Sequence, residues 1–222
     1  MLPNINPIQL IIVFIPLLFA VTIHEVAHGY VALRFGDGTA KFAGRLTLNP
    51  IKHLDPFGSV LLPLLLKISG SPVIFGYAKP VPVDFRNLRN RRIGTLCVAA
   101  AGVVTNFIAA LICAGILQGI RLFPAFLTSS ALAPLTSILI QLMAYSVMIN
   151  LVLGIFNLIP VPPLDGGRIL SMLLPQKYSR QFQTIEPFGI LILILLLMTN
   201  SLDLFISFFI SPLMNWMLQG YI

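Results

Sequence analysis

The chain has 222 residues, of which 57% are hydrophobic and only 9% are charged, and its formal net charge is +7. This composition is typical of a polytopic membrane protein and argues against a soluble domain with an ordinary polar surface. At roughly 20 residues per membrane helix, there is room for about five to six spans. The basic residues are spread along loops beside apolar segments, which indicates membrane orientation and no nucleic-acid partner.

The first predicted element is an apolar helix over about residues 7–35, ended by the Gly-Asp-Gly sequence at 36–38. It contains His24 and His28, which lie on one face of a helix because they are four residues apart. Neutral imidazoles are good zinc ligands. Glu25 borders that face without being forced to bind, so it is suited to act as general base toward water at a metal. Ionisable groups inside a bilayer are costly and usually functional, which favours a metal site over a chance match.

Residues 39–85 are predicted to form a short membrane-associated β or re-entrant region between the first two full spans. Residues 39–50 alternate loosely between apolar and polar and end in turn residues, which favours a hairpin or an extended segment. Residues 56–66 are apolar but too short to cross the hydrocarbon layer, so a re-entrant or interfacial element fits them better. Residues 71–85 are rich in proline, glycine and aromatic side chains, and we expect an extended conformation there.

Two further core spans are predicted over about residues 93–120 and 135–163. The first is rich in alanine and glycine, which lets neighbouring helices approach closely. Prolines break the second, and a short helix is expected over 164–174. Residues 187–218 are predicted to form a C-terminal hairpin of two short spans. The predicted fold class is an all-α polytopic membrane protein, with residues 1–222 as a single domain.

Basic residues gather in the loop between the first two spans and in the loop after the third, whereas Arg121 alone falls between the second and third. The positive-inside rule places the two basic loops in the cytoplasm and the N-terminus outside. We therefore expect a multi-pass protein of the cell inner (plasma) membrane. The inner half of the first span and the proline-broken end of the third then lie at the same depth, toward the cytoplasmic side.

Asp165 follows those prolines and precedes two glycines, which allow close approach of the backbone. As a third ligand it would complete a His, His, carboxylate set with one position left for water. Alone, Asp165 would be interpreted as the N-cap of the following short helix, but its pairing with His24 and His28 favours ligation. His53 lies in a polar loop, so a loop or interface role is favoured for it over ligation. The two cysteines, Cys97 and Cys113, are interpreted as small core residues.

These motifs resemble the site-2 protease family of intramembrane zinc metalloproteases, in its compact form without extra domains. The resemblance covers nearly the whole chain and rests on His24-Glu25-x-x-His28 and on Asn157-x-x-Pro160-x-x-Pro163-Leu164-Asp165-Gly166. The family's Gly-Pro-x-x-Asn element corresponds here to Gly102-Val103-Val104-Thr105-Asn106, with Val103 where the proline is common. Residues 76–83 look like the family's membrane-associated extended segment near the substrate path.

The resemblance implies that His24, His28 and Asp165 bind one Zn²⁺ ion per chain and that Glu25 is the catalytic base. It implies that Asn106 holds the substrate carbonyl or the oxyanion. The residues implied in substrate binding are Asn157, Gly76 and Tyr77. For each asparagine, a hydrogen bond between helices is the alternative role. The implied activity is hydrolysis of peptide bonds in or near transmembrane segments of membrane proteins in the lipid bilayer, with the extended segment as a possible pairing edge for the unwound substrate.

Two other functions are open to a chain of this kind. A zinc-binding membrane transporter would explain buried ligands, but the sequence has no internal repeat and no ladder of acidic residues across the membrane. A non-catalytic homologue that only binds membrane helices would need the metal ligands but would have no use for Glu25. The sequence therefore favours the protease.

Overall fold

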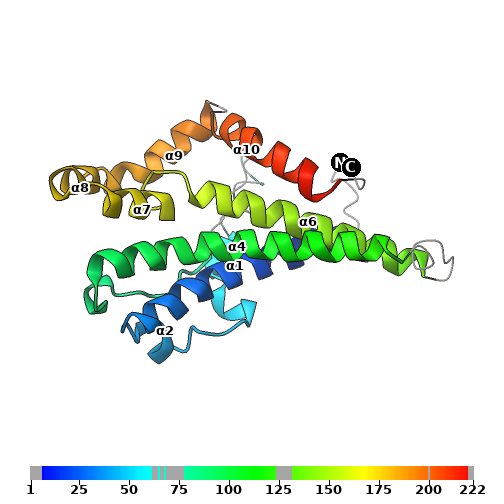
Figure 1. Ribbon diagram of the computed structural model, residues 1–222, viewed down its shortest axis with the longest axis horizontal. Coiled ribbons are helices and arrows are strands. Elements are labelled where there is room, and N and C mark those ends of the chain that lie inside the picture. The colour runs from blue at the N-terminus through cyan, green and yellow to red at the C-terminus, as the bar shows by residue number, and fades with distance from the viewer. Residues whose placement is uncertain are drawn as a thin grey trace.

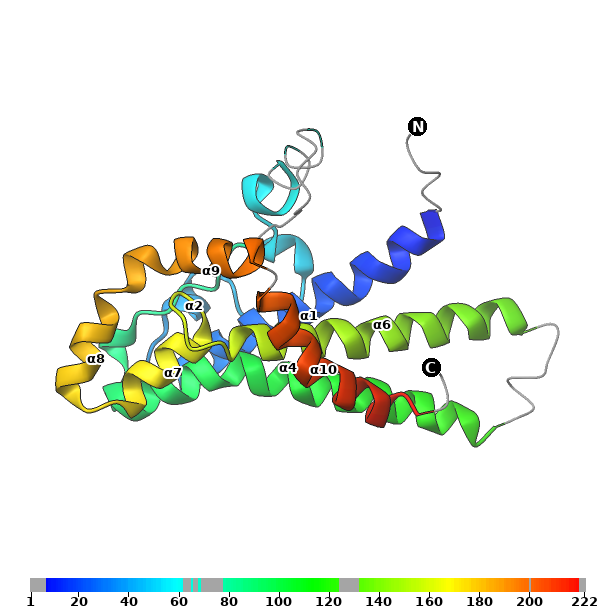
Figure 2. The same cartoon turned by 90° about the horizontal axis from the view of Figure 1, so that it is seen from above.

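The structure is a computed structural model that describes residues 7–61, 65, 68, 78–123, 132–199 and 201–219. Within these ranges all regular elements are helical, and no strand is assigned. Three long helices, α1 (Pro7–Arg34), α4 (Arg91–Arg121) and α6 (Ala133–Asn157), form the centre of the molecule. Helix α4 packs against both α1 and α6 (Figure 1). Figure 2 shows that α4 and α6 run side by side in opposite directions.

Helix α1 ends where the sequence predicts. Gly36 adopts a φ of 106°, a left-handed conformation that glycine adopts without steric penalty. The Gly36 amide donates to the Leu33 carbonyl at 3.1 Å, and the Asp37 amide donates to the Ala32 carbonyl at 2.9 Å. This pair of bonds is a Schellman motif, which satisfies the last carbonyls of the helix and turns the chain away from it.

Helix α4 begins at a side-chain cap and carries small residues on its packed face. The Asn90 side chain accepts a hydrogen bond from the Ile93 amide at 3.1 Å. Buried positions of α4 include Gly94, Ala99, Gly102 and Ala110. Small side chains let the backbones of α1 and α6 approach α4 closely, as the composition of this span predicts.

Shorter helices surround this centre. Between α1 and α4 lie α2 (Thr39–Phe42), η1 (Pro50–His53), η2 (Pro56–Leu61) and η3 (Phe85–Asn87). After α6 follow α7 (Asp165–Leu173), α8 (Gln176–Gln183), η4 (Glu186–Phe188), α9 (Gly189–Met198) and α10 (Ser201–Met217). Helices α7 and α8 lie at the end of the molecule where α4 begins, and α10 returns along α6 (Figures 1 and 2).

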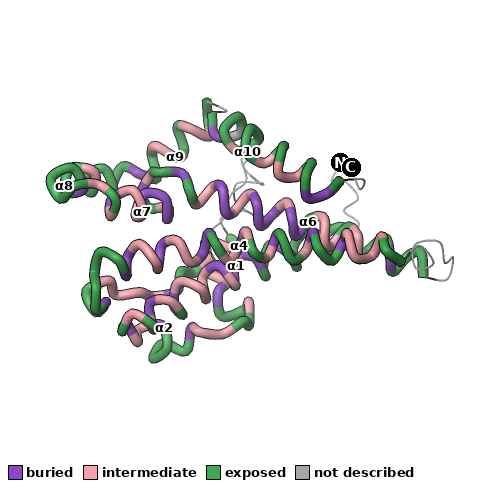
Figure 3. The backbone as a smooth tube through the Cα atoms, in the orientation of Figure 1, coloured by how far each residue is buried: buried purple, intermediate pink, exposed green. Residues whose placement is uncertain are grey.

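The main apolar core lies between α4, α6 and α10, where its buried members are Ala110, Ala114, Leu117, Val147, Leu151, Met217 and Leu218. The outer faces of the helices are also apolar and yet exposed, for example at Phe14, Ile112 and Phe208. In Figure 3, purple recurs along the packed helices α4 and α6 and is sparse on α9 and α10, which are largely green and pink. Large exposed apolar faces are typical of helices that face lipid.

Four described helical segments are long and apolar enough to cross a membrane: Ile11–Arg34, Arg91–Arg121, Ala133–Asn157 and Gln176–Met198. The predicted all-helical membrane architecture is thus confirmed, but the count of five to six spans is not. The predicted C-terminal hairpin divides differently, because α8, η4 and α9 together make one 23-residue span. Helix α10 has 17 residues, or about 25 Å of helix, which is shorter than the hydrocarbon layer of roughly 30 Å.

The predicted β or re-entrant region is also not confirmed. Residues 39–42 form a helical turn instead of a hairpin strand, because Asp37 Oδ1 accepts from both the amide and the hydroxyl of Thr39 and starts a helix there. Residues 56–61 are helical and short, and their re-entrant placement stays a prediction. Residues 78–84 carry no regular element, in accord with an extended segment, and residues 71–77 lie outside the described part of the chain.

Candidate metal centre

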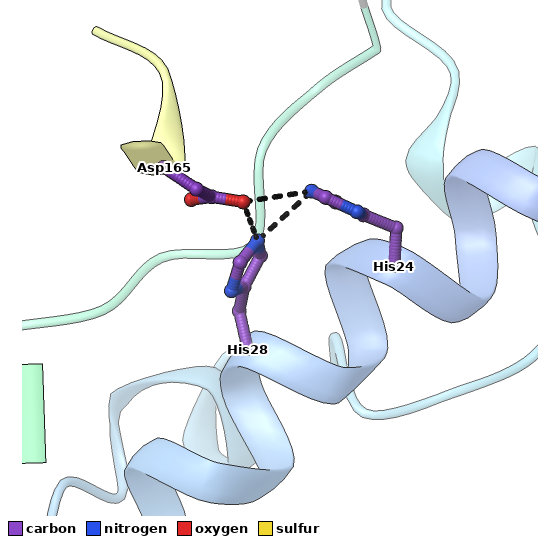
Figure 4. Close-up of side chains that lie close together, drawn as sticks. All are labelled: His24, His28 and Asp165. Carbon is purple, nitrogen blue, oxygen red and sulfur yellow. Dashed lines mark hydrogen bonds and ion pairs between the residues drawn. The ribbon is translucent and has the colours of Figure 1, made fainter. Parts of the chain in front are cut away.

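Three side chains from two distant parts of the sequence meet at one point. His24 and His28 project from one face of α1, and Asp165 is the first residue of α7 (Figure 4). Asp165 Oδ2 lies 3.3 Å from Nε2 of each histidine, and the two Nε2 atoms lie 3.0 Å apart. His24 and Asp165 are buried, with exposed fractions of 7% and 9%. The convergence that the sequence predicts for these three residues is therefore present in the fold.

The loop between α6 and α7 brings Asp165 to this point. Prolines at 160, 162 and 163 end α6, and Gly166 and Gly167 allow the new helix to fold back against the loop. A Cβ atom on Gly166 would collide with the Leu158 carbonyl, and one on Gly167 would lie 2.6 Å from the Pro162 nitrogen. Asp165 makes no side-chain cap of α7, since its carboxylate points at the histidines instead. The capping alternative for Asp165 is therefore wrong.

Hydrogen bonds fix which nitrogen of each ring carries the proton. His28 Nδ1 lies 2.7 Å from the Val98 carbonyl oxygen, which can only accept, so Nδ1 carries the hydrogen. His24 Nδ1 lies 2.6 Å from Asn106 Oδ1, which also accepts. In the neutral rings, both Nε2 atoms then present lone pairs to the centre. Ligating histidines in proteins are held in this way by an acceptor on their other nitrogen.

The orientation of the Asn106 amide is itself fixed by α6. Asn150 Nδ2 donates to the Ser146 carbonyl at 2.8 Å, so Asn150 Oδ1 is free to accept from Asn106 Nδ2 at 2.9 Å. Asn106 Nδ2 also lies 3.4 Å from the Ala20 carbonyl, which leaves Asn106 Oδ1 facing His24. Both asparagines are buried, with exposed fractions of 0% and 2%. A directional relay thus runs from a backbone carbonyl of α6 through α4 to a metal-facing ring on α1.

The arrangement fits a zinc ion. Two imidazole lone pairs and a carboxylate oxygen at these distances repel one another unless a cation lies between them, and buried Asp165 Oδ2 has no hydrogen-bond donor. Ligand atoms about 2.0–2.1 Å from a tetrahedral zinc ion lie about 3.3 Å from each other, which matches the 3.3 Å from Asp165 Oδ2 to each Nε2 atom and is slightly longer than the 3.0 Å between the two Nε2 atoms. Gly102 provides the space that the two imidazole rings occupy, because a Cβ atom at this position would lie 2.5 Å from His24 Cε1 and 2.6 Å from His28 Nε2.

Glu25 lies beside the ligands but takes no part in the cluster. Its Oε2 accepts a hydrogen bond from the Val81 amide at 2.7 Å, which ties the carboxylate to the extended segment 78–84. That segment is anchored elsewhere as well: the Lys79 amide donates to the His53 carbonyl, and its carbonyl accepts from Arg45 Nη2 at 2.7 Å. The Glu25 carboxylate is therefore held at the edge of the metal centre, between α1 and the segment.

Asp37 fastens the other end of the same segment to α1. Its Oδ2 accepts from the Asp84 amide at 2.9 Å, and its Oδ1 accepts from Asn87 Nδ2 at 3.1 Å. Burial acts to raise the pKa of Asp37, but the hydrogen bonds from Thr39, Asn87 and the Asp84 amide outweigh it and hold the pKa below its ordinary value. The half-buried Asp84 pairs with the exposed Arg86, and this pairing lowers the pKa of Asp84 to about 2.

The other predicted site residues are placed as follows. Asn157 Nδ2 donates to the Leu153 carbonyl at 2.9 Å, so its amide is directed back along α6. His53 is buried outside the cluster, with Nε2 2.8 Å from the Thr47 carbonyl, in accord with its predicted loop role. Cys97 and Cys113 are free thiols in α4. Gly76 and Tyr77 lie outside the described residues.

Sequence reasoning missed Asn150, Val98 and the steric role of Gly102. A single asparagine in an apolar helix has no periodic partner, and a backbone acceptor leaves no mark in the sequence. The one available signal was the presence of two asparagines, Asn106 and Asn150, at about mid-span of two helices that must both pack on α1. A buried polar side chain in a membrane helix calls for a partner in a neighbouring helix.

Comparisons with known proteins agree with this geometry. Residues 12–199 match the model of Peptidase family M50. The chain is 43% identical over 190 residues to "Putative zinc metalloprotease YwhC" of Bacillus subtilis, covering 83% of this chain and 79% of that protein. It is 29% identical over 204 residues to "Putative zinc metalloprotease Rip2" of Mycolicibacterium smegmatis, covering 90% and 73%. It is 28% identical over 178 residues to "Zinc metalloprotease MJ0392" of Methanocaldococcus jannaschii, covering 78% and 38%.

No solved structure matches the chain. The family match spans the metal-centre residues of α1, α4 and α7 together with the four candidate membrane spans, so it includes both the site and its scaffold. The chain therefore belongs to peptidase family M50, and its resemblance to the site-2 proteases is confirmed.

Proposed function

We propose that this chain is an intramembrane zinc metalloprotease that hydrolyses peptide bonds in or near transmembrane segments of membrane proteins. The observation that carries the proposal is the meeting of His24, His28 and Asp165 inside an apolar helical bundle, with Glu25 beside them. Three largely buried ionisable side chains that face each other would only destabilise a helical bundle whose helices simply pack together, so the cluster indicates a function. In this proposal residues 1–222 act as one protease domain.

His24, His28 and Asp165 hold the zinc ion, and the relay through Asn106 and Asn150 keeps the His24 lone pair aimed at it. When bound, zinc supplies Lewis acidity, which lowers the pKa of water to about 7 and polarises a carbonyl. Glu25 accepts a proton as the water oxygen attacks the carbonyl carbon of the peptide bond. When the carbon–nitrogen bond breaks, Glu25 delivers that proton to the leaving amine, so the carboxylate is restored.

For Asn106 the geometry supports a positioning role. The family resemblance implies that this side chain holds the substrate carbonyl or oxyanion, but its oxygen faces His24 Nδ1 and its nitrogen faces Asn150 Oδ1 and the Ala20 carbonyl. A group that is already hydrogen-bonded through both polar atoms has little capacity left for a substrate. We therefore assign Asn106 to the support of His24. Asn157, Gly76 and Tyr77 stay predictions for substrate binding.

The extended segment beside Glu25 supports a restricted form of strand pairing. Its amides at Lys79, Val81 and Asp84 are already used within the protein, and Pro80 and Pro82 have no amide hydrogen. Among these residues only the Val83 amide donates no hydrogen bond within the described part of the chain, so an unwound substrate that pairs with residues 79–84 would mainly donate its own amides to carbonyls of this segment. The segment thus selects a substrate in an extended conformation next to the catalytic base. Membrane-protein substrates reach it by lateral diffusion in the bilayer.

The distribution of basic loops supports an inner (plasma) membrane protein with its N-terminus outside and the metal centre toward the cytoplasmic side. The variants Lys177→Cys and Arg121→Cys, each made in a background without Cys97 and Cys113, test this orientation. A membrane-impermeant thiol reagent added outside intact cells should label the cysteine at 121 and leave that at 177 unlabelled. Labelling of 177 alone would reverse the orientation and leave the chemistry of the site untouched.

Glu25→Gln tests the enzymatic proposal. The variant keeps the metal ligands, so purified protein should retain about one zinc ion per chain, whereas cleavage of a co-reconstituted, tagged single-span protein with a helix-breaking span should be lost. His24→Ala serves as the matched control that loses both zinc and cleavage. Cleavage by Glu25→Gln would remove Glu25 from the role of base. Zinc flux through liposomes containing a chain that cleaves no substrate would favour the transporter instead.

A further inference from the structure

A second, strongly basic cleft opens at the end of the molecule where α4 begins. Its volume is about 730 Å³, within the range of small-molecule sites. The walls come from the start of α4, the loop before α7, and helices α7 and α8, which Figures 1 and 2 both place at the same end of the bundle. His24, His28 and Asp165 do not line it. The cleft is thus separate from the metal centre, although Gly167 belongs to its wall.

Four arginines line this cleft against one acidic residue, Glu186; they are Arg91, Arg92, Arg168 and Arg180. Arg92 is engaged with the C-terminal end of α7, since Nε donates to the Met172 carbonyl at 2.8 Å. The Arg168 guanidinium stacks over the Phe85 ring at 4.7 Å. In the described ranges, no carboxylate oxygen lies within 4.0 Å of Arg91, Arg168 or Arg180. The cleft therefore concentrates positive charge that the protein itself does not neutralise.

The polar and apolar groups of the walls indicate the kind of anion. Hydroxyl and amide groups of Thr95, Ser171 and Gln183 lie among the arginines, and guanidinium groups bind phosphate oxygens in bidentate fashion. Phe85, Met172 and Phe182 add apolar surface in the same cleft. A ligand with a phosphate group next to an apolar body satisfies both kinds of wall.

The position of the cleft indicates the source of that phosphate. Two candidate membrane spans, Arg91–Arg121 and Gln176–Met198, begin with residues that line it. Their first turns mark the boundary between hydrocarbon and water, where lipid headgroups lie. Basic pockets between membrane helices at this level bind anionic headgroups.

We propose that this cleft binds the phosphate headgroup of an anionic phospholipid. Bound headgroup oxygens contact Arg91 and Arg180 from α4 and α8 and brace the first turn of α7, where Gly167 and Arg168 lie two and three residues after Asp165. The lipid thereby ties the helix that carries the third metal ligand to the start of α4. This inference does not depend on peptide hydrolysis, and its test uses binding alone.

The test compares an Arg91→Gln, Arg180→Gln double variant with a Lys41→Gln, Lys52→Gln control. Both variants remove two positive charges from exposed positions. The control residues lie between α1 and α4, outside the cleft, whereas Arg91 and Arg180 line it near the start of two candidate spans. Full-length protein in nanodiscs of phosphatidylcholine with graded phosphatidylglycerol is analysed for retained lipid by native mass spectrometry. Each basic contact strengthens such binding roughly fivefold, so the cleft variant should retain phosphatidylglycerol about twenty-five-fold more weakly than the control.

Two further arms make the result decisive. Inorganic phosphate and ATP are titrated against detergent-solubilised protein without added lipid, with the thermal midpoint as readout. No protection, together with selective loss of phosphatidylglycerol in the cleft variant, supports the proposal. Protection by either soluble phosphate that requires Arg91 and Arg180 would assign the cleft to a soluble ligand and overturn the lipid. Equal lipid retention by the cleft variant and the control would overturn the site altogether.

Discussion

Asn150 makes no contact with a metal-ligand atom, yet through Asn106 it determines whether His24 Nε2 presents a lone pair to the metal. Asn150→Leu removes the acceptor that fixes the Asn106 amide, so this amide can turn and offer its nitrogen to His24 Nδ1. That arrangement favours the ring tautomer with its hydrogen on Nε2, which cannot bind a metal. Loss of such supporting groups weakens metal binding about 10- to 100-fold. Zinc affinity measured by competition with a fluorescent chelator should fall by this factor.

Asn157→Leu provides the matched control for Asn150→Leu. It makes the same substitution in the same helix, but Asn157 bonds only to the Leu153 carbonyl among the described contacts. Zinc affinity should therefore stay near that of the unaltered protein. If the two variants bound zinc equally well, Asn150 would be a packing residue only.

Gly102 is a second residue whose effect on the site is steric. In Gly102→Ala the new methyl group would lie 2.5–2.7 Å from ring atoms of His24 and His28. The rings cannot swing away, because hydrogen bonds hold the Nδ1 atom of each. We expect zinc content below one half per chain and a loss of peptidase activity. Gly115→Ala in the same helix meets nothing within 4 Å and should keep both. Full zinc content in Gly102→Ala would show that α1 can move aside.

At the level of helices and loops, Asp37 holds the segment that carries the Val81 contact to Glu25. Its folded pKa lies below the ordinary value of 3.8, so the ionised form stabilises the folded state. This contribution is present above the ordinary pKa and is lost as the pH falls through the folded value. Asp37→Asn should lower the free energy of unfolding by about 1–3 kcal/mol at pH 7 and flatten its decline below pH 4.

Denaturant unfolding in detergent between pH 3 and pH 7 measures this effect. Asp84→Asn is the companion variant, since Asp84 is only half-buried and its partner Arg86 is 79% exposed, so that water screens their pairing. Its effect should be clearly smaller than that of Asp37→Asn. Parallel pH profiles for the unaltered protein and Asp37→Asn would contradict the anchoring role of Asp37.

The same elements explain what the sequence could and could not predict. The bounds of α1 and α4 follow from apolar runs and from stop signals such as Gly36, and they were predicted to within a few residues. Helix α6 ends at Asn157, six residues before the predicted bound of 163, because the prolines from 160 onward do not continue the helix. Residues 39–42 were predicted wrongly, because local alternation suggested a strand whereas the bonds from Thr39 to Asp37 start a helical turn. The ligand set was recognisable because His24 and His28 have a fixed spacing. The relay through Asn150 was not, since it depends on how α4 and α6 pack.

Across the whole molecule, the metal centre is a cross-link between α1 and α7. Without a cation, three lone-pair donors face each other at 3.0–3.3 Å in a buried site, so α7 is expected to lose its hold on α1. An ion that binds only the folded state stabilises it by about 2.7 kcal/mol when its free concentration is 100 times its dissociation constant. Removal of zinc with a strong chelator should therefore lower the thermal midpoint by several degrees.

Asp165→Asn separates this cross-link from other effects of the chelator. The amide keeps the shape of the side chain but loses the charge and the anionic ligand, so the midpoint of this variant should be low already and should not respond to chelator or added zinc. Readdition of zinc should restore the unaltered protein alone. A midpoint that was the same with and without zinc in the unaltered protein would mean that helix packing by α4 holds α1 and α7 together, with the ion contributing to chemistry only.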